Sequence, residues 1–141
     1  MTEPRKWLEF ARQDLVVAQA AFDAAIYNQA CFHAQQGVEK ALKGFLHSRQ
    51  QPVPRTHALR ELLARCCRLD AGIETLKEAC VTLDGYYIPT RYPEALPGMG
   101  PKDCPRAKTP RKPSRSCARR WTGLRGRLRD ASTMSDTFQL L

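Results

Sequence analysis

Five polar side chains that could bind phosphate recur every three or four residues between positions 33 and 47. They are His33, Gln36, Lys40, Lys43 and His47, and this spacing places them on one face of a helix. Imidazole, amide and ammonium groups together supply hydrogen-bond donors and a cationic field, which suits a phosphate or a nucleotide. The alternative is a solvated helix face on which Glu39 and Lys43 pair four residues apart.

A second candidate group is His57, which follows Thr56. We expect Thr56 to cap a helix, and the exposed amides of a helix N-terminus favour anions. An imidazole at this point could help to hold a phosphate. The alternative is that His57 only completes the turn at the cap.

The third candidate is Arg91, within a segment rich in tyrosine and proline over residues 86–93. A guanidinium beside Tyr87 and Tyr92 can stack on aromatic rings and still bind phosphate oxygens. Equally, Arg91 could tie the segment to a carboxylate such as Asp84 or Asp14. The predicted ligand-binding residues are His33, Gln36, Lys40, Lys43, His57, Tyr87, Arg91 and Tyr92, and His33, His57 and Arg91 are the candidates for any catalysis.

Several classes of site have no motif in this sequence. It contains no glycine-rich phosphate loop, no H-E-x-x-H and no G-x-S-x-G pattern. There is also no C-x-x-C pair, and the first four cysteines fall on predicted apolar helix faces, as reduced core thiols do. We therefore expect neither a metal nor a cofactor. The six cysteines are Cys31, Cys66, Cys67, Cys80, Cys104 and Cys117.

The net charge of +9 is concentrated near the end of the chain. Residues 1–99 carry 12 lysines and arginines against 11 acidic residues, whereas residues 100–141 carry 11 against 3. A basic tail containing Trp121 could grip a nucleic-acid backbone in a salt-dependent way. Non-specific attraction of a cationic segment is the alternative. The tail cations include Lys102, Lys108, Arg111, Lys112, Arg115, Arg119, Arg120, Arg125, Arg127 and Arg129.

Hydrophobic spacing predicts an all-α fold. We expect helices over 3–24, from about 28 through the stripe that ends at Leu46, from Thr56 to Cys67, and over 73–84, where Gly85 stops the last one. The short first connection predicts an antiparallel hairpin. A domain is expected over 1–99, followed by a basic Pro/Arg/Ser-rich segment over 100–141 with a short amphipathic helix at 115–129. Without an apolar leader or a membrane span, the protein is expected to be cytoplasmic.

Three motifs resemble the HEPN domain family. They are residues 30–43 (ACFHAQQGVEKALK), Thr56-His57-x-Leu59, and Tyr87-x-x-x-Arg91-Tyr92-Pro93, in that order. The resemblance covers roughly residues 5–97. It implies an up-and-down bundle of four to five helices, commonly a homodimer, that acts in nucleotide or RNA metabolism. It also implies a nucleotidyltransferase-type partner, including in toxin–antitoxin pairs.

The sequence departs from the family in two places. Many HEPN proteins are metal-independent ribonucleases whose site is Arg followed after four to six residues by His, but none of His33, His47 and His57 has an Arg at that distance. The family's last helix is rich in Ala, Glu and Leu, whereas this chain after about Asp103 is rich in Arg, Pro and Ser. An altered reading frame or an engineered change after about residue 100 would explain that difference.

We therefore expect a nucleotide- or RNA-associated HEPN-like binding module rather than an enzyme. One alternative is a metal-independent ribonuclease in which His33 or His57 acts as acid or base and Arg91 stabilises the pentavalent phosphate. Another alternative is a non-catalytic regulatory or scaffold subunit.

Overall fold

The computed structural model describes residues 3–85, and this part of the chain is entirely helical apart from its connections. It contains α1 (Glu3–Asp23), α2 (Tyr27–Ser48), α3 (Leu59–Cys67), the 3-10 helix η1 (Ala71–Leu76) and α4 (Lys77–Asp84). The all-α prediction is confirmed. The segment with Tyr87, Arg91 and Tyr92, the boundary at residue 99, the helix over 115–129 and the basic tail lie outside the described residues.

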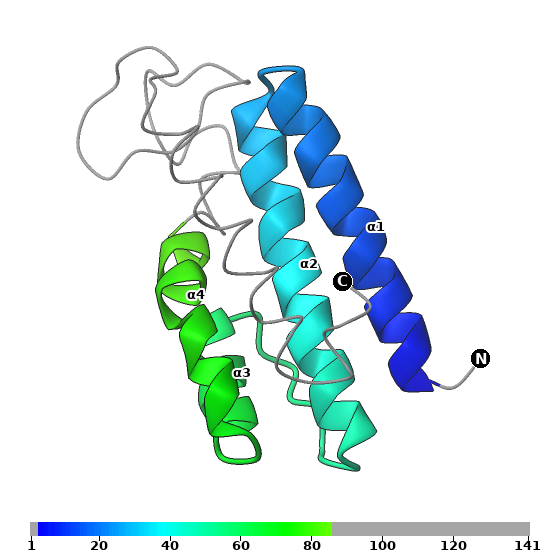
Figure 1. The fold of residues 1–141 in the computed structure, drawn as a ribbon, viewed down its shortest axis with the longest axis vertical. Coiled ribbons are helices and arrows are strands. Elements are labelled where there is room, and N and C mark those ends of the chain that lie inside the picture. Colours follow the sequence, from blue (N-terminus) through cyan, green and yellow to red (C-terminus); the bar gives the residue numbers. More distant parts are fainter. Residues whose placement is uncertain (1–2, 86–141) are drawn as a thin grey trace.

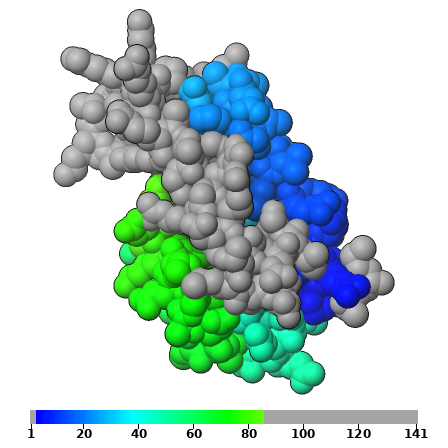
Figure 2. All heavy atoms as spheres, in the orientation of Figure 1, coloured from blue at the N-terminus to red at the C-terminus, as the bar shows by residue number. Residues whose placement is uncertain are grey.

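Helix α2 lies at the centre of the arrangement. α1 packs antiparallel along one side of it, as the short connection predicts, and α3 and α4 pack on the other side (Figure 1). In the space-filling view, the surfaces of α1 and of α4 lie on opposite sides of the described residues (Figure 2). The residues of α2 that fill the core on both sides include Ala34, Val38, Ala41, Leu42, Phe45 and Leu46, all at most 2% exposed.

Two glycines of α2 set the distance between α1 and α2. A Cβ built on Gly44 would lie 2.9 Å from Cβ of Trp7, and one built on Gly37 would lie 3.0 Å from the side chain of Leu15. Real Cβ atoms essentially never approach as closely as 2.9 Å, so a side chain at Gly44 would push α1 and α2 apart, whereas one at Gly37 would require Leu15 to shift. The seven-residue spacing of the glycines keeps both on the face toward α1.

Both long helices end in a Schellman motif that lacks the usual glycine. At the end of α1, the amide of Ile26 donates to the carbonyl of Ala21 (2.8 Å) and that of Ala25 to Phe22 (2.9 Å), with Ala25 in the left-handed region at φ 58°. Gln50 occupies the same position after α2, at φ 55°. A Cβ in this region costs about 1–2 kcal/mol, so both turns are strained.

We expect Ala25→Gly to stabilise the fold by about 1 kcal/mol, because glycine adopts a positive φ without a Cβ clash. Urea denaturation would measure the change in the free energy of unfolding. Ala20→Gly, at an exposed position within α1, is the control and should destabilise by about 1 kcal/mol. Equal losses for the two variants would contradict this account of the turn.

The start of α3 differs from the prediction. Thr56 is not the helix cap: its Oγ1 accepts from the amide of Ala58 (3.1 Å), before the helix begins. The helix N-terminus is capped instead by Asp84 at the end of α4, whose carboxylate accepts from the amides of Leu59 (2.7 Å) and Arg60 (3.1 Å). A carboxylate there also suits the helix dipole. The cap thus comes from a residue 25 positions away, which local sequence cannot reveal.

The last predicted helix, over 73–84, is divided in two. Its first part belongs to the 3-10 helix Ala71–Leu76, whose start is capped by Asp70 accepting from the amide of Gly72 (2.9 Å). The α-helix proper begins at Lys77. Ile73 and Leu76 are nevertheless buried, as the apolar spacing predicts.

Replacing Asp84 by alanine should destabilise the protein by about 1–3 kcal/mol, because two helix amides lose a charged acceptor at once. Thermal or urea unfolding would show it. The control is Asp23→Ala at the exposed end of α1, whose carboxylate accepts from Gln19 in the same helix (2.8 Å). Equal decreases in the free energy of unfolding for the two variants would show that Asp84 does not cap α3.

Candidate functional site

Two carboxylates divide the polar side chains of α2 into two clusters. The first cluster forms on Asp14 of α1, which pairs with His33 (Nδ1 to Oδ1, 3.0 Å) and with Lys40 (Nζ to Oδ2, 2.5 Å). Lys40 also lies over the ring of Phe10, 5.9 Å from its centroid. The side chains of His33 and Lys40 are 26% and 30% exposed, so this cluster lies at the rim of the α1–α2 contact.

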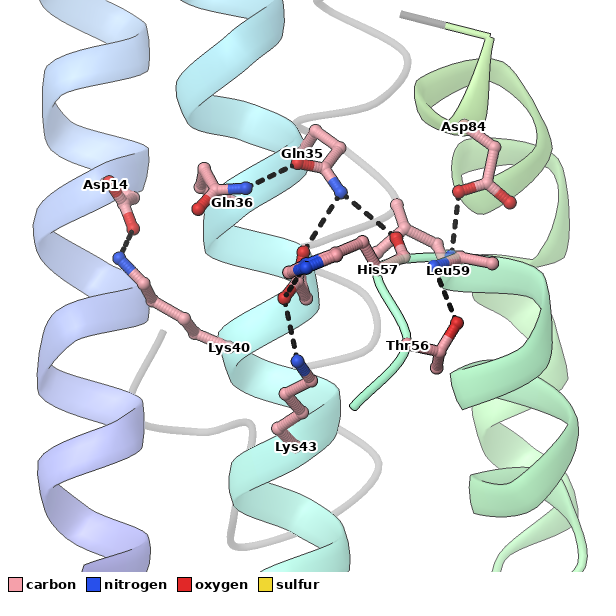
Figure 3. A network of polar contacts seen from close by, with 11 residues as sticks. Asp14, Gln35, Gln36, Lys40, Lys43, Thr56, His57, Leu59 and Asp84 are labelled. Carbon is pink, nitrogen blue, oxygen red and sulfur yellow. Dashed lines mark hydrogen bonds and ion pairs between the residues drawn. The ribbon is translucent and has the colours of Figure 1, made fainter. Parts of the chain in front are cut away.

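The second cluster surrounds Glu39, whose side chain is only 8% exposed. Its Oε1 accepts from Nζ of Lys43 (2.8 Å) and from Nδ1 of His57 (3.0 Å), and its Oε2 accepts from Nε2 of Gln35 (3.2 Å). Gln35 is fully buried and also donates to the main-chain carbonyl of His57 (3.3 Å). The cluster therefore fastens the segment before α3 to the middle of α2 (Figure 3).

Gln36 lies on α2 between the two clusters. Its Nε2 donates to Oε1 of Gln35 (2.7 Å), which connects it to the Glu39 cluster (Figure 3). Asp14 and Lys40 lie on one side of it and His57 on the other. His33, Gln36, Lys40, Lys43 and His57 thus belong to one polar band, defined as these residues with Asp14, Gln35 and Glu39. His47 lies apart, in the last turn of α2 near Glu3.

The electrostatics of the polar band differ from a solvated cationic face. Lys40 and Lys43 are balanced by Asp14 and Glu39, so the band has no net charge while its imidazoles are neutral. The i,i+4 pair of Glu39 with Lys43 is confirmed, but it is buried instead of solvated. A net positive charge on the polar band would require a protonated imidazole.

The pKa of Glu39 reflects opposing effects. Burial on its own would raise the pKa, but the hydrogen bond and charge of Lys43, with the hydrogen bonds from His57 and Gln35, outweigh it and hold the pKa below its usual value. The carboxylate is therefore ionised at neutral pH. A buried charge that makes three hydrogen bonds avoids most of the desolvation penalty.

Contrary to expectation, the amides of Leu59 and Arg60 at the N-terminus of α3 are not exposed for an anion, because both donate to the Asp84 carboxylate. His57 precedes the helix, and its imidazole is bonded to Glu39. Any anion at His57 would be held by side chains, without the help of those two amides.

Comparison with known families agrees with this architecture. The family model of the HEPN domain matches residues 4–117. The chain belongs to the HEPN domain family. The solved structure of a protein called TT1696, from Thermus thermophilus, has the same fold and is 30% identical, with a TM-score of 0.67 over 96% of this chain and 100% of that one. The curated proteins contain no match.

In this HEPN domain, sequence reasoning missed the acceptors that organise the polar band. Gln35 and Glu39 belong to the side of the helix that the apolar stripe leaves polar, yet both are buried. The sequence feature that indicates these contacts is the spacing of Gln35, Glu39 and Lys43 at intervals of four residues. This spacing places a donor, an acceptor and a donor next to one another along the helix. Asp14 was expected only as a partner for Arg91, and it pairs with His33 and Lys40.

Cysteine chemistry has little support in the described part of the HEPN domain. Cys31, Cys66, Cys67 and Cys80 are reduced thiols, as predicted. Burial raises the pKa of Cys66 and of Cys80 to about 12, and that of Cys67 also rises, chiefly through burial. Such thiols are protonated and are poor nucleophiles.

Among residues 3–85 no group of side chains could hold a metal ion, and no helix combines the length and apolar character of a membrane span.

Acid should destabilise the protein through Glu39. A carboxyl whose folded pKa is depressed stabilises the fold above its unfolded pKa, about 4.3 for glutamate, and this contribution is lost as the pH falls through the folded pKa. Urea unfolding between pH 7 and 3 would follow it. The double variant Glu39→Met with Lys43→Met removes the ion pair without stranding a buried charge. Its stability should fall less with acid, and parallel pH profiles would contradict the assignment.

Proposed function

We propose that this HEPN domain is a cytoplasmic binding module that holds the phosphate of a nucleotide or of an RNA end on its polar band. The supporting observation is the gathering of five donor side chains from α2 and the segment before α3: His33, Gln36, Lys40, Lys43 and His57, around two carboxylates. Charge-assisted hydrogen bonds from such groups are the usual means of holding phosphate oxygens.

Lys40 is the cation best placed to contact a ligand. Its side chain is 30% exposed, whereas that of Lys43 is 9% exposed and enclosed by the Glu39 cluster. A phosphate beside Asp14 would therefore recruit Lys40 and His33 first. Tyr87, Arg91 and Tyr92 remain proposed contributors from the following segment.

The resemblance to HEPN proteins also supports a working context. We propose a homodimer that acts beside a nucleotidyltransferase-type protein, as in toxin–antitoxin pairs. Light scattering on the purified protein tests the dimer, and co-purification with such a protein tests the partnership.

Binding should depend on a terminal phosphate. AMP and a 5′-phosphorylated oligoribonucleotide should bind in calorimetry, and the 5′-hydroxyl form should bind at least about tenfold more weakly. Lys40→Gln should reduce the affinity by about tenfold or more, since a hydrogen bond to a charged group is worth about 1.5–3 kcal/mol. Lys77→Gln is the control, because Lys77 is exposed and pairs with Glu74, which is not part of the polar band. No binding by AMP or by either RNA would refute the function.

A second candidate is a metal-independent ribonuclease, favoured by the bond between Glu39 and His57. A carboxylate that orients an imidazole is a common arrangement for acid–base catalysis. Labelled RNA incubated with the protein in EDTA distinguishes the two functions. Cleavage lost in His57→Ala, or in His33→Ala, would support the enzyme, and intact RNA would leave the binding module.

A further inference from the structure

His57 is held at two separate points although its side chain is 56% exposed. The ring is bonded at Nδ1 to Glu39, and the main-chain carbonyl accepts from Gln35. Gln35 therefore contacts both Glu39 and His57, the residue whose ring Glu39 orients (Figure 3). A buried amide and a buried carboxylate together fix both the backbone and the ring of one solvent-accessible histidine.

The chemistry of the imidazole makes this arrangement directional. A neutral ring carries one proton, and the hydrogen bonds made by its two nitrogens decide which of them carries it. Because an ionised carboxylate only accepts, Nδ1 must be the protonated nitrogen when it bonds to Glu39. Nε2, on the opposite edge of the ring, is then the nitrogen that takes up a proton.

Ion pairing alone does not account for this geometry. Lys43 already balances the charge of Glu39 at 2.8 Å from within the same helix. The contacts to His57 bring in a residue 18 positions further along the chain, with Gln35 bonded to its carbonyl as well. These additional bonds restrict His57 more than they neutralise Glu39.

We infer that Glu39 and Gln35 are positioning residues for His57, which hold its neutral ring in the Nδ1–H tautomer and present Nε2 to a phosphate oxygen of the ligand. The inference rests on the proposed phosphate-binding function. A ring protonated at both nitrogens would donate to Glu39 from Nδ1 and to the phosphate from Nε2. Glu39 contacts the ring at Nδ1, and Lys43 contacts the same carboxylate oxygen of Glu39.

The tautomer can be read directly from the nitrogen-15 shifts of the histidine side chains, recorded from about pH 5 to 9 on the full chain. In the wild type, neutral His57 should be the Nδ1–H form. In the double variant Glu39→Met with Lys43→Met, this preference should be lost, while Lys43→Met alone should retain it. Asp14→Asn is the matched control, because it removes the carboxylate of His33 and leaves that of His57.

An Nε2–H ring in the wild type, or the same tautomer in the double variant, would overturn the inference. The wild-type spectrum decides the question even if the double variant does not fold. Titration with inorganic phosphate and with AMP then tests the function separately, by the shift of the His57 Nε2 signal. An Nδ1–H ring that neither anion perturbs would overturn the phosphate site while leaving the positioning of the ring in place.

Discussion

Helix α2 is enclosed by α1 on one side and by α3 and α4 on the other, and the polar chemistry of the domain follows from that enclosure. Along such a helix, a polar side chain that cannot reach water must find a partner within the protein. Gln35, Glu39 and Lys43 satisfy this requirement with one another and with the segment before α3. The buried side chains of Gln35 and Glu39 thereby fasten His57 to α2.

The connections between helices obey a similar constraint. Neither long helix is followed by glycine, yet after each one the chain turns through a left-handed residue so that the last carbonyls of the helix are bonded. The N-terminus of α3 is satisfied from a distance by Asp84, which also pairs with Arg60 (3.4 Å). The bonds of Asp84 therefore join α3 to α4 in addition to apolar contacts, as those of Gln35 and Glu39 join α2 to the segment before α3.

The enclosure also changes what kind of ligand site an HEPN domain of this sequence can offer. Lys40 and Lys43 of α2 are each paired with a carboxylate, so attraction of an anion depends on rearranging an ion pair or on protonating an imidazole. Rearranging the ion pair or protonating the imidazole costs little free energy at the partly exposed pair of Lys40 with Asp14. The same changes cost more at the buried pair of Lys43 with Glu39. The two clusters therefore differ in their access to a ligand: the lysine of the Asp14 pair is 30% exposed, whereas that of the Glu39 pair is 9% exposed.

The sequence by itself determined the all-α fold, the antiparallel hairpin, the apolar stripe of α2 and the reduced cysteines, because each depends on residues at most a few turns apart. Membership of the HEPN family also followed from local motifs, now matched over residues 4–117. Only the tertiary structure decided that Asp84 and not Thr56 caps α3, that Asp14 pairs with His33 and Lys40, and that Glu39 is buried against His57. Those contacts join residues 18 to 26 positions apart. The spacing of residues along a helix fixes which side chains share a face, but the neighbouring helix decides whether that face meets water or a partner.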